Sequence, residues 1–312
     1  MTGSEGVSHL FDQMTTWELE ERSSAVRVCS TIHGLFESVL YRVGIRGAST
    51  VSKFASRAFK DRGAVVRNAT GARFAFPAWD SYWGHYFYGR RPYEPEIALL
   101  IAAYASDGQS SFLDCGANYG FWSTVARPVL GGQVVAIELS PDIMSWLDRN
   151  AAGTTITTLN AAVWSEDGVA MSILKEGPNQ SHSAFVGKPG SGVLSRSVDS
   201  VVAERGIDPA HLLVKVDCEG AEVRVLQGAA HSASHGAAFI LEDHGADTTC
   251  AVSSRVLELG WQLAIYIPSA GGWQTTNDLN DVRRMKSDRV RGYNVLAWTG
   301  ERPLLLDGAF VR

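Results

Sequence analysis

Short apolar runs alternate with helical segments from residue 111 to residue 298. The helical segments are expected to start near residues 120, 141, 220 and 248. Strands are expected at 111–115, 133–138, 155–160, 212–217, 237–242, 261–267 and 293–298. Such alternation is the mark of an open α/β sheet. The pattern therefore predicts one large α/β core over 111–312.

Two further segments precede this core. Residues 1–60 carry apolar side chains at helical spacing and predict a helical extension, which packs on the core or on another subunit, or acts as a lid. Residues 61–110 begin with an expected hairpin at 63–78 and continue through an aromatic-rich stretch. The aromatic side chains either pack together or stack on a sugar face. They are Trp79, Tyr82, Trp83, Tyr86, Phe87 and Tyr88.

Composition excludes several classes of protein. The 312 residues carry a formal net charge of −5, so nucleic acid is not an expected partner. The four cysteines show no zinc-type spacing, which predicts a reduced protein without a metal. The N-terminus has no basic, apolar leader, and no run approaches the ~20 apolar residues of a membrane span. We expect a soluble, cytoplasmic protein without a membrane partner.

The stretch FLDCGANYGFW (112–122) leaves the first core strand through an unusual bend. Gly116, Asn118 and Gly120 stand at alternate positions. Glycine permits positive φ, and asparagine is among the few other residues that tolerate it. The following helix presents unpaired N–H groups to the bend. A ligand is therefore expected outside the carboxyl end of this strand.

The spacing of the bend differs from the dinucleotide fingerprint G-x-G-x-x-G, because Asn118 replaces the second glycine and the next glycine comes one position early. An acid is nevertheless present at the end of the second strand, where Glu138 can accept both hydroxyls of a ribose. The arrangement resembles the S-adenosylmethionine loop of Rossmann-like methyltransferases.

A second motif, LLVKVDCEGAEVRVLQGA (212–229), closely resembles the signature of the FkbM family of methyltransferases. The D-x-G-A-N-x-G loop, Tyr93–Glu94, NAAVWSEDG (160–168), SVDSVVAERG (197–206) and FILEDH (239–244) resemble that family as well. The resemblance implies a seven-stranded, mostly parallel sheet with an antiparallel last strand. It also implies S-adenosylmethionine-dependent methylation, typically of a hydroxyl on a sugar or polyketide-like metabolite. Cys218 and Asp243 depart from the usual pattern.

The resemblance assigns the cofactor site to residues around the loop. Asp114 would fix the loop and hold the cofactor's ammonium, and Glu138 would bind the ribose. Asn160 and Ala161 would pass near the adenine, and Asp217 would face the reactive end. The expected cofactor-binding residues are Glu94, Asp114, Gly116, Asn118, Gly120, Glu138, Asn160, Ala161 and Asp217.

Three side chains are candidates for the chemistry on the acceptor. His244 follows the fifth strand and suits a general base, although it could equally cap the next helix. His182 is the rival histidine, and Asp217 is the third candidate. Lys215 shares a strand face with Asp217, and a buried lysine needs a carboxylate partner, for which Glu242 is a candidate.

Other functions remain open at this point. The acceptor could be an amine or a carboxylate, and an NAD(P)-dependent oxidoreductase or a non-catalytic binding scaffold are the remaining alternatives. The expected partner is a small-molecule acceptor, with a homo-oligomer formed through the N-terminal helices as a further expectation. Cys115 and Cys218 each follow a strand-end aspartate, so neighbouring strands would bring the two thiols close together.

Overall fold

The computed structural model describes residues 4–20, 24–35, 63–174, 185–187, 192–288 and 292–311. Internal contacts divide the chain into two units. One comprises Met1–Phe11 and Glu96–Arg312, and the other comprises Asp12–Pro95. Helix α6 (Pro95–Tyr104) belongs mostly to the larger unit.

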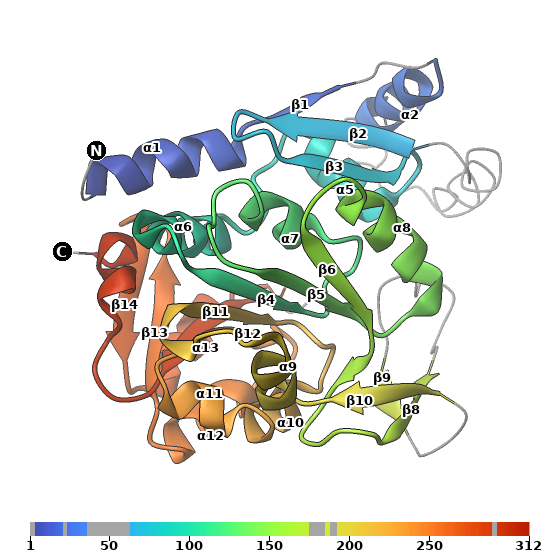
Figure 1. Ribbon diagram of the computed structural model, residues 1–312. Helices are drawn as coiled ribbons and strands as arrows, with labels where there is room; N and C mark the ends of the chain where they lie inside the picture. Colours follow the sequence, from blue (N-terminus) through green and yellow to red (C-terminus); the bar gives the residue numbers. More distant parts are fainter. Residues whose placement is uncertain are drawn as a thin grey trace. The chain divides into compact units, whose positions relative to one another are not determined.

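The larger unit is built on a sheet that has eight strands within the described residues (Figure 1). The strand order is β14-β13-β15-β12-β11-β4-β5-β6. The strands are β4 (Ser111–Cys115), β5 (Val134–Glu138), β6 (Ile156–Asn160), β11 (Leu212–Val216), β12 (Ala238–Glu242), β13 (Gln262–Ile267), β14 (Gly272–Thr276) and β15 (Asn294–Trp298).

The seven predicted core strands are all present, and the predicted α/β class is confirmed. Strands β6, β5, β4, β11 and β12 form parallel pairs in this order, while β15 runs antiparallel between β12 and β13. The prediction of seven strands was one short, because β14 extends the sheet as a hairpin with β13. The segment GWQTT of β14 has a half-polar pattern and was not recognised as a strand.

Alternate residues of the central strands face opposite sides of the sheet. Leu113, Val214 and Phe239 belong to one apolar cluster that includes side chains from the helices on that side. These helices are α9 (Val198–Arg205), α10 (Glu222–Gln227), α11 (Ala230–Ser234), α12 (Ala251–Glu258) and α13 (Leu279–Met285).

The opposite face of the sheet packs against different helices. Ala136 of β5 contacts Leu147 of α8 (Pro141–Ala151) on this side. The short helix α7 (Phe121–Ala126) follows β4 directly. Asp114 is the register partner of both Ala136 and Lys215, so these three side chains share this second face. The polar side chains of the central strands therefore lie on the face of α8.

The insertion between β6 and α9 forms a small second sheet. In the described residues its strand order is β7 (Ala162–Val163), β10 (Val193–Arg196), β8 (Ala170–Leu174) and β9 (Phe185–Gly187). Short 3-10 turns also occur at Ala105–Asp107, Pro209–His211 and Leu304–Ala309.

The smaller unit has an antiparallel sheet, which in its described part is ordered β1 (Trp17–Leu19), β2 (Gly63–Asn68) and β3 (Arg73–Pro77). The predicted hairpin is confirmed, and its turn is closed by Asn68, whose Oδ1 accepts the backbone N–H groups of Thr70 and Ala72. The strand β1 corrects the expectation that residues 1–60 are helical throughout.

The helices described in the N-terminal region are α1 (Ser4–Thr15) and α2 (Ser24–Leu35), followed by α5 (Ser81–Phe87) after the hairpin. The aromatic stretch contributes at least in part to packing, because Trp83 is buried with its ring 4.8 Å from that of Phe74. The side chains of residues 32–60, which belong to the predicted helical extension, lie outside the part of the chain whose side chains are described.

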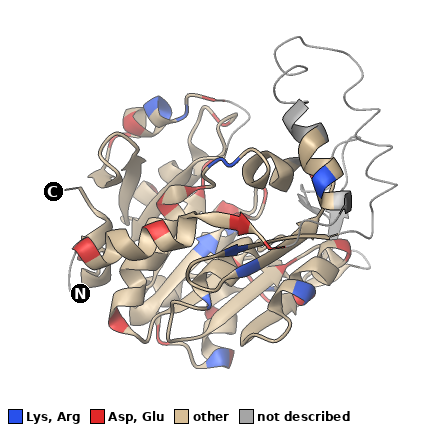
Figure 2. Ribbon diagram, turned by 90° about the horizontal axis from the view of Figure 1, so that it is seen from above, with Lys and Arg blue, Asp and Glu red and all other residues tan. Residues whose placement is uncertain are grey.

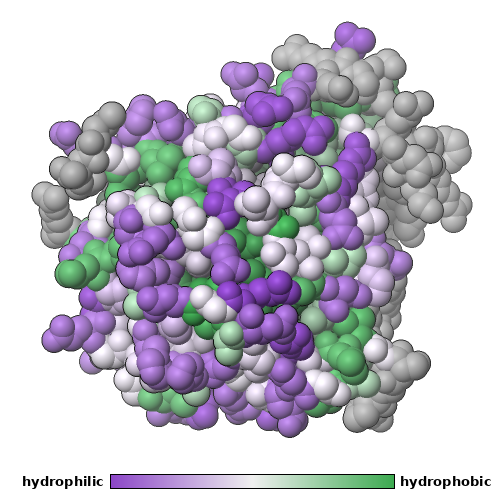
Figure 3. All heavy atoms as spheres, viewed as in Figure 1, coloured by the Kyte–Doolittle hydropathy of each residue, from purple (hydrophilic) through white to green (hydrophobic). Residues whose placement is uncertain are grey.

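Charged residues are spread over many elements of the ribbon (Figure 2). On the face shown in Figure 3, hydrophilic and hydrophobic residues are interspersed. None of the described helices is both long enough and apolar enough to span a membrane.

Candidate active site

The bend after β4 has the backbone geometry that its sequence predicted. Gly116, Asn118 and Gly120 have φ values of 78°, 53° and 82°. A Cβ at Gly116 would lie 1.7 Å from the carbonyl oxygen of Asp217, so only glycine fits against the neighbouring strand end. The N–H groups of Gly116 and Ala117 both donate to the Ile137 carbonyl, at 3.0 and 2.9 Å. The bend is thus fixed between the ends of β5 and β11.

Asp114 anchors this bend from inside the protein. It is 1% exposed, and its Oδ2 accepts the N–H and hydroxyl of Ser123 in α7, at 3.1 and 2.7 Å. The other oxygen, Oδ1, is buried and has no hydrogen-bond partner among the described residues. Burial raises the pKa of Asp114, while Lys215 and the Ser123 bonds oppose the rise. The site thus holds one carboxylate oxygen with unmet capacity.

A second aspartate in the same sheet repeats the arrangement with one difference. Asp243 follows β12, is fully buried, and accepts through Oδ2 from the N–H and hydroxyl of Ser253, at 3.2 and 2.5 Å. Its Oδ1 accepts from the buried ammonium of Lys286 at 2.6 Å. The comparison shows that this strand–helix arrangement can accommodate an ammonium on Oδ1, whereas Oδ1 of Asp114 has no hydrogen-bond donor among the described residues.

Glu138 connects the bend to the end of β5. Its Oε2 accepts the N–H of Asn118 at 2.9 Å, and its Oε1 accepts the N–H of Ser140 at 2.8 Å. The side chain is buried, and burial is the main cause that raises its pKa, with smaller contributions from the charges of Asp114 and Asp217. Each carboxylate oxygen can accept a second donor, so Glu138 keeps the acceptor capacity for two ribose hydroxyls.

The residues expected near an adenine lie beside Glu138. Asn160 is its register partner on β6, and the Asn160 Nδ2 donates to the carbonyls of Glu138 and Leu139, at 2.8 and 3.0 Å. The N–H of Ala161 donates to the Glu138 carbonyl at 3.2 Å, and Ala161 itself is buried. Both residues are thus held at the same edge of the sheet as the bend.

Asp217 lies directly after β11, with its backbone N–H donating to the Cys115 carbonyl at 3.0 Å. Its Oδ2 accepts from the buried Lys215 ammonium at 3.0 Å. The side chain of Asp217 is 27% exposed, so it stays accessible at the end of the sheet. The ion pair shown for Lys215 is therefore with Asp217, whereas the sequence suggested Glu242.

The glutamates after Asp217 divide into two roles. Glu222 caps its own turn, with its carboxylate accepting the N–H groups of Cys218 and Gly220. Glu219 has a positive φ of 51° and opens the turn before Gly220.

The predicted strand order behind the cysteine pair is confirmed. Strands β4 and β11 are parallel neighbours, and Cys115 pairs in register with Val216. Both Cys115 and Cys218 are free. Burial, followed by the nearby Cys115, raises the pKa of the Cys218 thiol.

The candidate histidines and Glu94 are placed differently. His244 is exposed, and its Nδ1 accepts the backbone N–H of Ala246 at 3.1 Å in the turn after β12. It does not cap the next helix, α12, whose N-cap residue is Cys250. In a neutral ring with this contact, Nε2 carries the proton. His182 lies outside the described residues. Glu94 belongs to the smaller unit and has a positive φ of 39°, and its role as a cofactor ligand stays a prediction.

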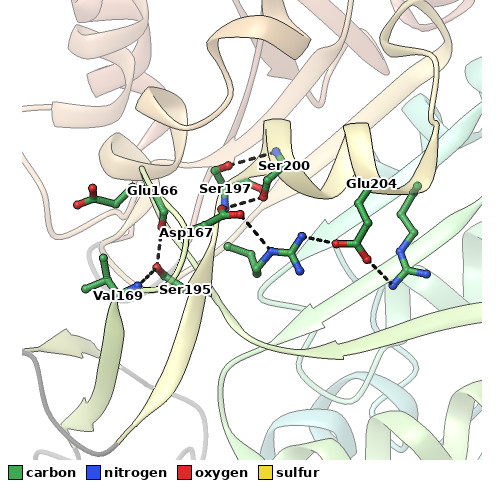
Figure 4. Close-up of polar contacts among 9 residues, drawn as sticks. Glu166, Asp167, Val169, Ser195, Ser197, Ser200 and Glu204 are labelled. Atoms are coloured by element: carbon green, nitrogen blue, oxygen red, sulfur yellow. Dashed lines mark hydrogen bonds and ion pairs between the residues drawn. The ribbon is translucent and has the colours of Figure 1, made fainter.

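A polar cluster missed at the sequence level joins the segments NAAVWSEDG and SVDSVVAERG (Figure 4). Asp167 accepts the N–H of Ser197 at 2.6 Å and the hydroxyl of Ser200 at 2.8 Å. Arg196 lies 3.4 Å from Asp167 and 2.5 Å from Glu204. The two family-like segments are therefore held together by structural contacts. The sequence indicated this contact only in that both segments resemble the same family.

The mostly parallel sheet, the glycine-containing bend and the strand-end acids define the Rossmann-like methyltransferase class of α/β proteins. Residues 114–252 match the sequence model of the methyltransferase FkbM domain. The match confirms the resemblance to the FkbM methyltransferases that the signature predicted, over this part of the chain. In the described residues, no group of three or more His, Cys, Asp or Glu side chains is placed to hold a metal.

Several solved structures are similar at low identity. A precorrin-6y C5,15-methyltransferase from Geobacter metallireducens is 11% identical over 65% of this chain and 86% of its own, with a TM-score of 0.39. An S-adenosylmethionine-dependent O-methyltransferase from Thermotoga maritima is 12% identical over 80% and 82%, with a TM-score of 0.37. A ribosomal protein L11 methylase from Lactobacillus delbrueckii subsp. bulgaricus is 12% identical over 66% and 81%, with a TM-score of 0.33. Comparison with curated proteins gave no match.

Proposed function

We propose that this methyltransferase transfers the methyl group of S-adenosylmethionine to a hydroxyl oxygen of a small molecule, a sugar or a polyketide-like metabolite. The observation that carries the cofactor assignment is the unpartnered, buried Oδ1 of Asp114 beside the bend. S-adenosylmethionine carries an ammonium that this oxygen would accept. The ammonium of Lys286 contacts the equivalent oxygen of Asp243, which supports the assignment of an ammonium to Oδ1 of Asp114.

The electrostatics of the site support this cofactor over a dinucleotide. Asp114 and Asp217 each raise the pKa of Glu138, and Asp217 also raises that of Asp114. The three carboxyl groups outnumber the Lys215 ammonium, which pairs with Asp217 and lowers the pKa of Asp114, and so favour a negative potential at one edge of the sheet. S-adenosylmethionine has a net positive charge, whereas NAD(P) would bring its pyrophosphate against these acids. The oxidoreductase alternative is disfavoured on this ground.

The residues of the chain would have distinct roles in cofactor binding and catalysis. Asp114 binds the ammonium, Glu138 accepts the ribose hydroxyls, and Asn160 with Ala161 borders the adenine. When bound, the cofactor supplies an electrophilic methyl group. The chain orients the acceptor oxygen in line with that group and removes its proton, so catalysis is mostly proximity and orientation plus one base. Asp217 stands at the reactive end.

The remaining expectations belong to the same proposal. Glu94 is a further proposed cofactor ligand, and His244, His182 and Asp217 are the proposed candidates for the base. The acceptor is the proposed partner, in a cytoplasmic pathway of natural-product biosynthesis. The N-terminal helices are proposed to mediate self-association.

The paired aspartates allow a controlled test of the cofactor site. Asp114→Asn should weaken S-adenosylhomocysteine binding about tenfold or more in calorimetry, because a charged hydrogen bond is worth roughly 1.5–3 kcal/mol. Asp243→Asn is the matched control, since it changes an aspartate with the same serine contacts. It should lower the melting temperature but leave the affinity within about threefold.

Two results would contradict the cofactor proposal. One is an equal loss of affinity in both variants, and the other is stabilisation of the wild-type protein by NADH but not by S-adenosylhomocysteine. The acceptor class is tested by methyl transfer from labelled S-adenosylmethionine to a panel of sugar and polyketide hydroxyls. Transfer to amines or carboxylates alone would replace the hydroxyl assignment.

A further inference from the structure

Polar side chains from three neighbouring strands meet on one face of the sheet, beyond the cofactor bend. The register places Val216 opposite Leu241, so the next residues, Asp217 and Glu242, also lie side by side. Glu242 is in turn the register partner of Asn294 on β15. The same face carries Asp114, whose Oδ1 is buried and unpartnered in the described chain.

The two acids at the centre of this row are in direct contact. Asp217 and Glu242 share a side-chain hydrogen bond, and one of the two carboxyl groups must carry a proton to donate it. Lys215 holds the Oδ2 of Asp217 at 3.0 Å. The Oε1 of Glu242 lies against the backbone of Gly292, where a Cβ would be only 1.9 Å away. Asp217 is thus held by a cation on one side and by Glu242 on the other.

The surroundings decide which of the two acids keeps the proton. Burial raises the pKa of Glu242 to about 10, and the charges of Asp217, Glu219 and Glu222 add to the rise. From the antiparallel neighbour β15, the facing group is the neutral Asn294 amide, which donates to Glu96 at 2.9 Å. Lys215 is a cation on this face and its ammonium contacts Asp217.

We propose that Asp217 and Glu242 form a carboxyl pair with one proton, in which Glu242 keeps the proton and positions the Asp217 carboxylate to accept the proton of the methyl acceptor. Glu242 is then a positioning residue and Asp217 the catalytic base. This inference rests on the proposed methyl transfer to a hydroxyl, but the state of the pair exists in the free protein and can be tested there.

The step balances without a further reactant. The bond between the sulfur and the methyl carbon breaks as the bond between the acceptor oxygen and that carbon forms. The hydroxyl proton passes to a carboxylate oxygen of Asp217, and the sulfur leaves as the neutral thioether of S-adenosylhomocysteine. Proton release to water returns Asp217 to its charged form, with Glu242 protonated throughout.

The first test needs neither cofactor nor acceptor. Infrared spectroscopy of the free protein at pH 7.5 should show the carbonyl stretch of a protonated carboxylic acid, which Glu242→Gln should remove. Glu301→Gln, at an exposed position in the same unit, is the matched control and should retain the band. Because burial also raises the pKa values of Asp114 and Glu138, the spectrum of Glu242→Gln is subtracted from that of the wild type. A difference spectrum without the protonated-acid band would overturn the assignment of the proton to Glu242.

The second test separates positioning from mere structural support. Glutamine mimics a protonated glutamate and still donates to Asp217, so Glu242→Gln should keep kcat within about fivefold at pH 7.5 on any hydroxyl acceptor that turns over. Glu242→Ala should lower kcat by about 10–100-fold, and Asp217→Asn by roughly 10²–10⁴. Wild-type kcat should fall as pH approaches 10, and Glu242→Gln should resist this fall.

The outcomes distinguish this proposal from the proposed function. Equal losses in Glu242→Gln and Glu242→Ala, with unchanged pH profiles, would refute the positioning role. If no hydroxyl in the panel accepts a methyl group, the hydroxyl assignment fails, whereas the infrared result still decides where the proton lies.

Discussion

Replacement of Glu138 offers a quantitative test of how the bend is held. Its carboxylate accepts two backbone N–H groups, those of Asn118 at 2.9 Å and Ser140 at 2.8 Å. Hydrogen bonds to charged groups contribute roughly 1.5–3 kcal/mol each, and burial of the carboxylate offsets part of this, as its raised pKa indicates. We therefore expect Glu138→Ala to lower the free energy of unfolding by about 2–3 kcal/mol in the absence of any ligand.

The change should appear in thermal unfolding. For a domain of this size a loss of 1 kcal/mol lowers the melting temperature by about 2–4 °C, so the expected shift is about 4–12 °C. Glu138→Gln should fall between wild type and alanine, because its amide oxygen can satisfy only one of the two N–H groups. Glu301→Ala, an exposed position, is the control and should shift the melting temperature by less than about 2 °C.

Calorimetry then separates the bend from the ribose. Glu138→Ala should also weaken S-adenosylhomocysteine binding at least about tenfold, because two charged hydrogen bonds to the ribose are lost. A variant that melts like wild type would show that Glu138 does not hold the bend. A variant with full affinity would refute its assignment to the ribose.

Three further changes test other parts of the structure. Gly116→Ala should unfold the protein or abolish cofactor binding, because the new Cβ would lie 1.7 Å from a carbonyl oxygen. Gly153 has a similar φ but open space around it, so Gly153→Ala should lower the free energy of unfolding by only about 1–2 kcal/mol. Equal effects of the two changes would refute the clash. His244→Ala should lower kcat by less than about tenfold, because Nδ1 already accepts a backbone N–H; a loss of 10²–10⁴ would make it the base instead. Asp167→Ala should destabilise the protein by about 1–3 kcal/mol without changing cofactor affinity. Burial raises the pKa of Asp167, but hydrogen bonds from Ser197 and Ser200 outweigh it and lower the pKa. The contribution of Asp167 to stability should therefore be full above about pH 4 and disappear as the pH falls below that value. A series of denaturation curves in which the stability difference from Asp167→Ala does not shrink at low pH would contradict this.

The sequence predicted the core strands well because each is a short apolar run bounded by turn residues. The segment SFLDC became β4 at the expected residues, and the three positive φ values of the bend were foreseen from glycine and asparagine alone. Such features depend on local residue chemistry, so they can be predicted without knowledge of the fold.

Features that depend on contacts between residues far apart in the sequence were not predicted. Strand β14 is marked by little apolar alternation and exists because β13 offers it a hairpin partner. The ammonium on Asp243 comes from Lys286, 43 residues later, and no local pattern connects the two. The ion pair of Lys215 with Asp217 was within reach, because residues two apart on a strand share a face.

The contact between Asp217 and Glu242 also required the strand order. Their strands are far apart in the sequence and become neighbours only in the sheet. The sequence placed both acids at strand ends, but it gave no indication that one would raise the pKa of the other. The pairing is thus a property of the assembled sheet edge.

The unmatched oxygen of Asp114 has a consequence for how a ligand would bind. Burial raises the pKa of this carboxyl in the free protein. An ammonium placed beside Oδ1 would favour the charged form and lower the same pKa. Between the two pKa values, binding must therefore release a proton, and the heat of binding depends on the buffer that takes it up. The affinity for the cofactor rises with pH across this interval and becomes constant once the free carboxyl is already ionised.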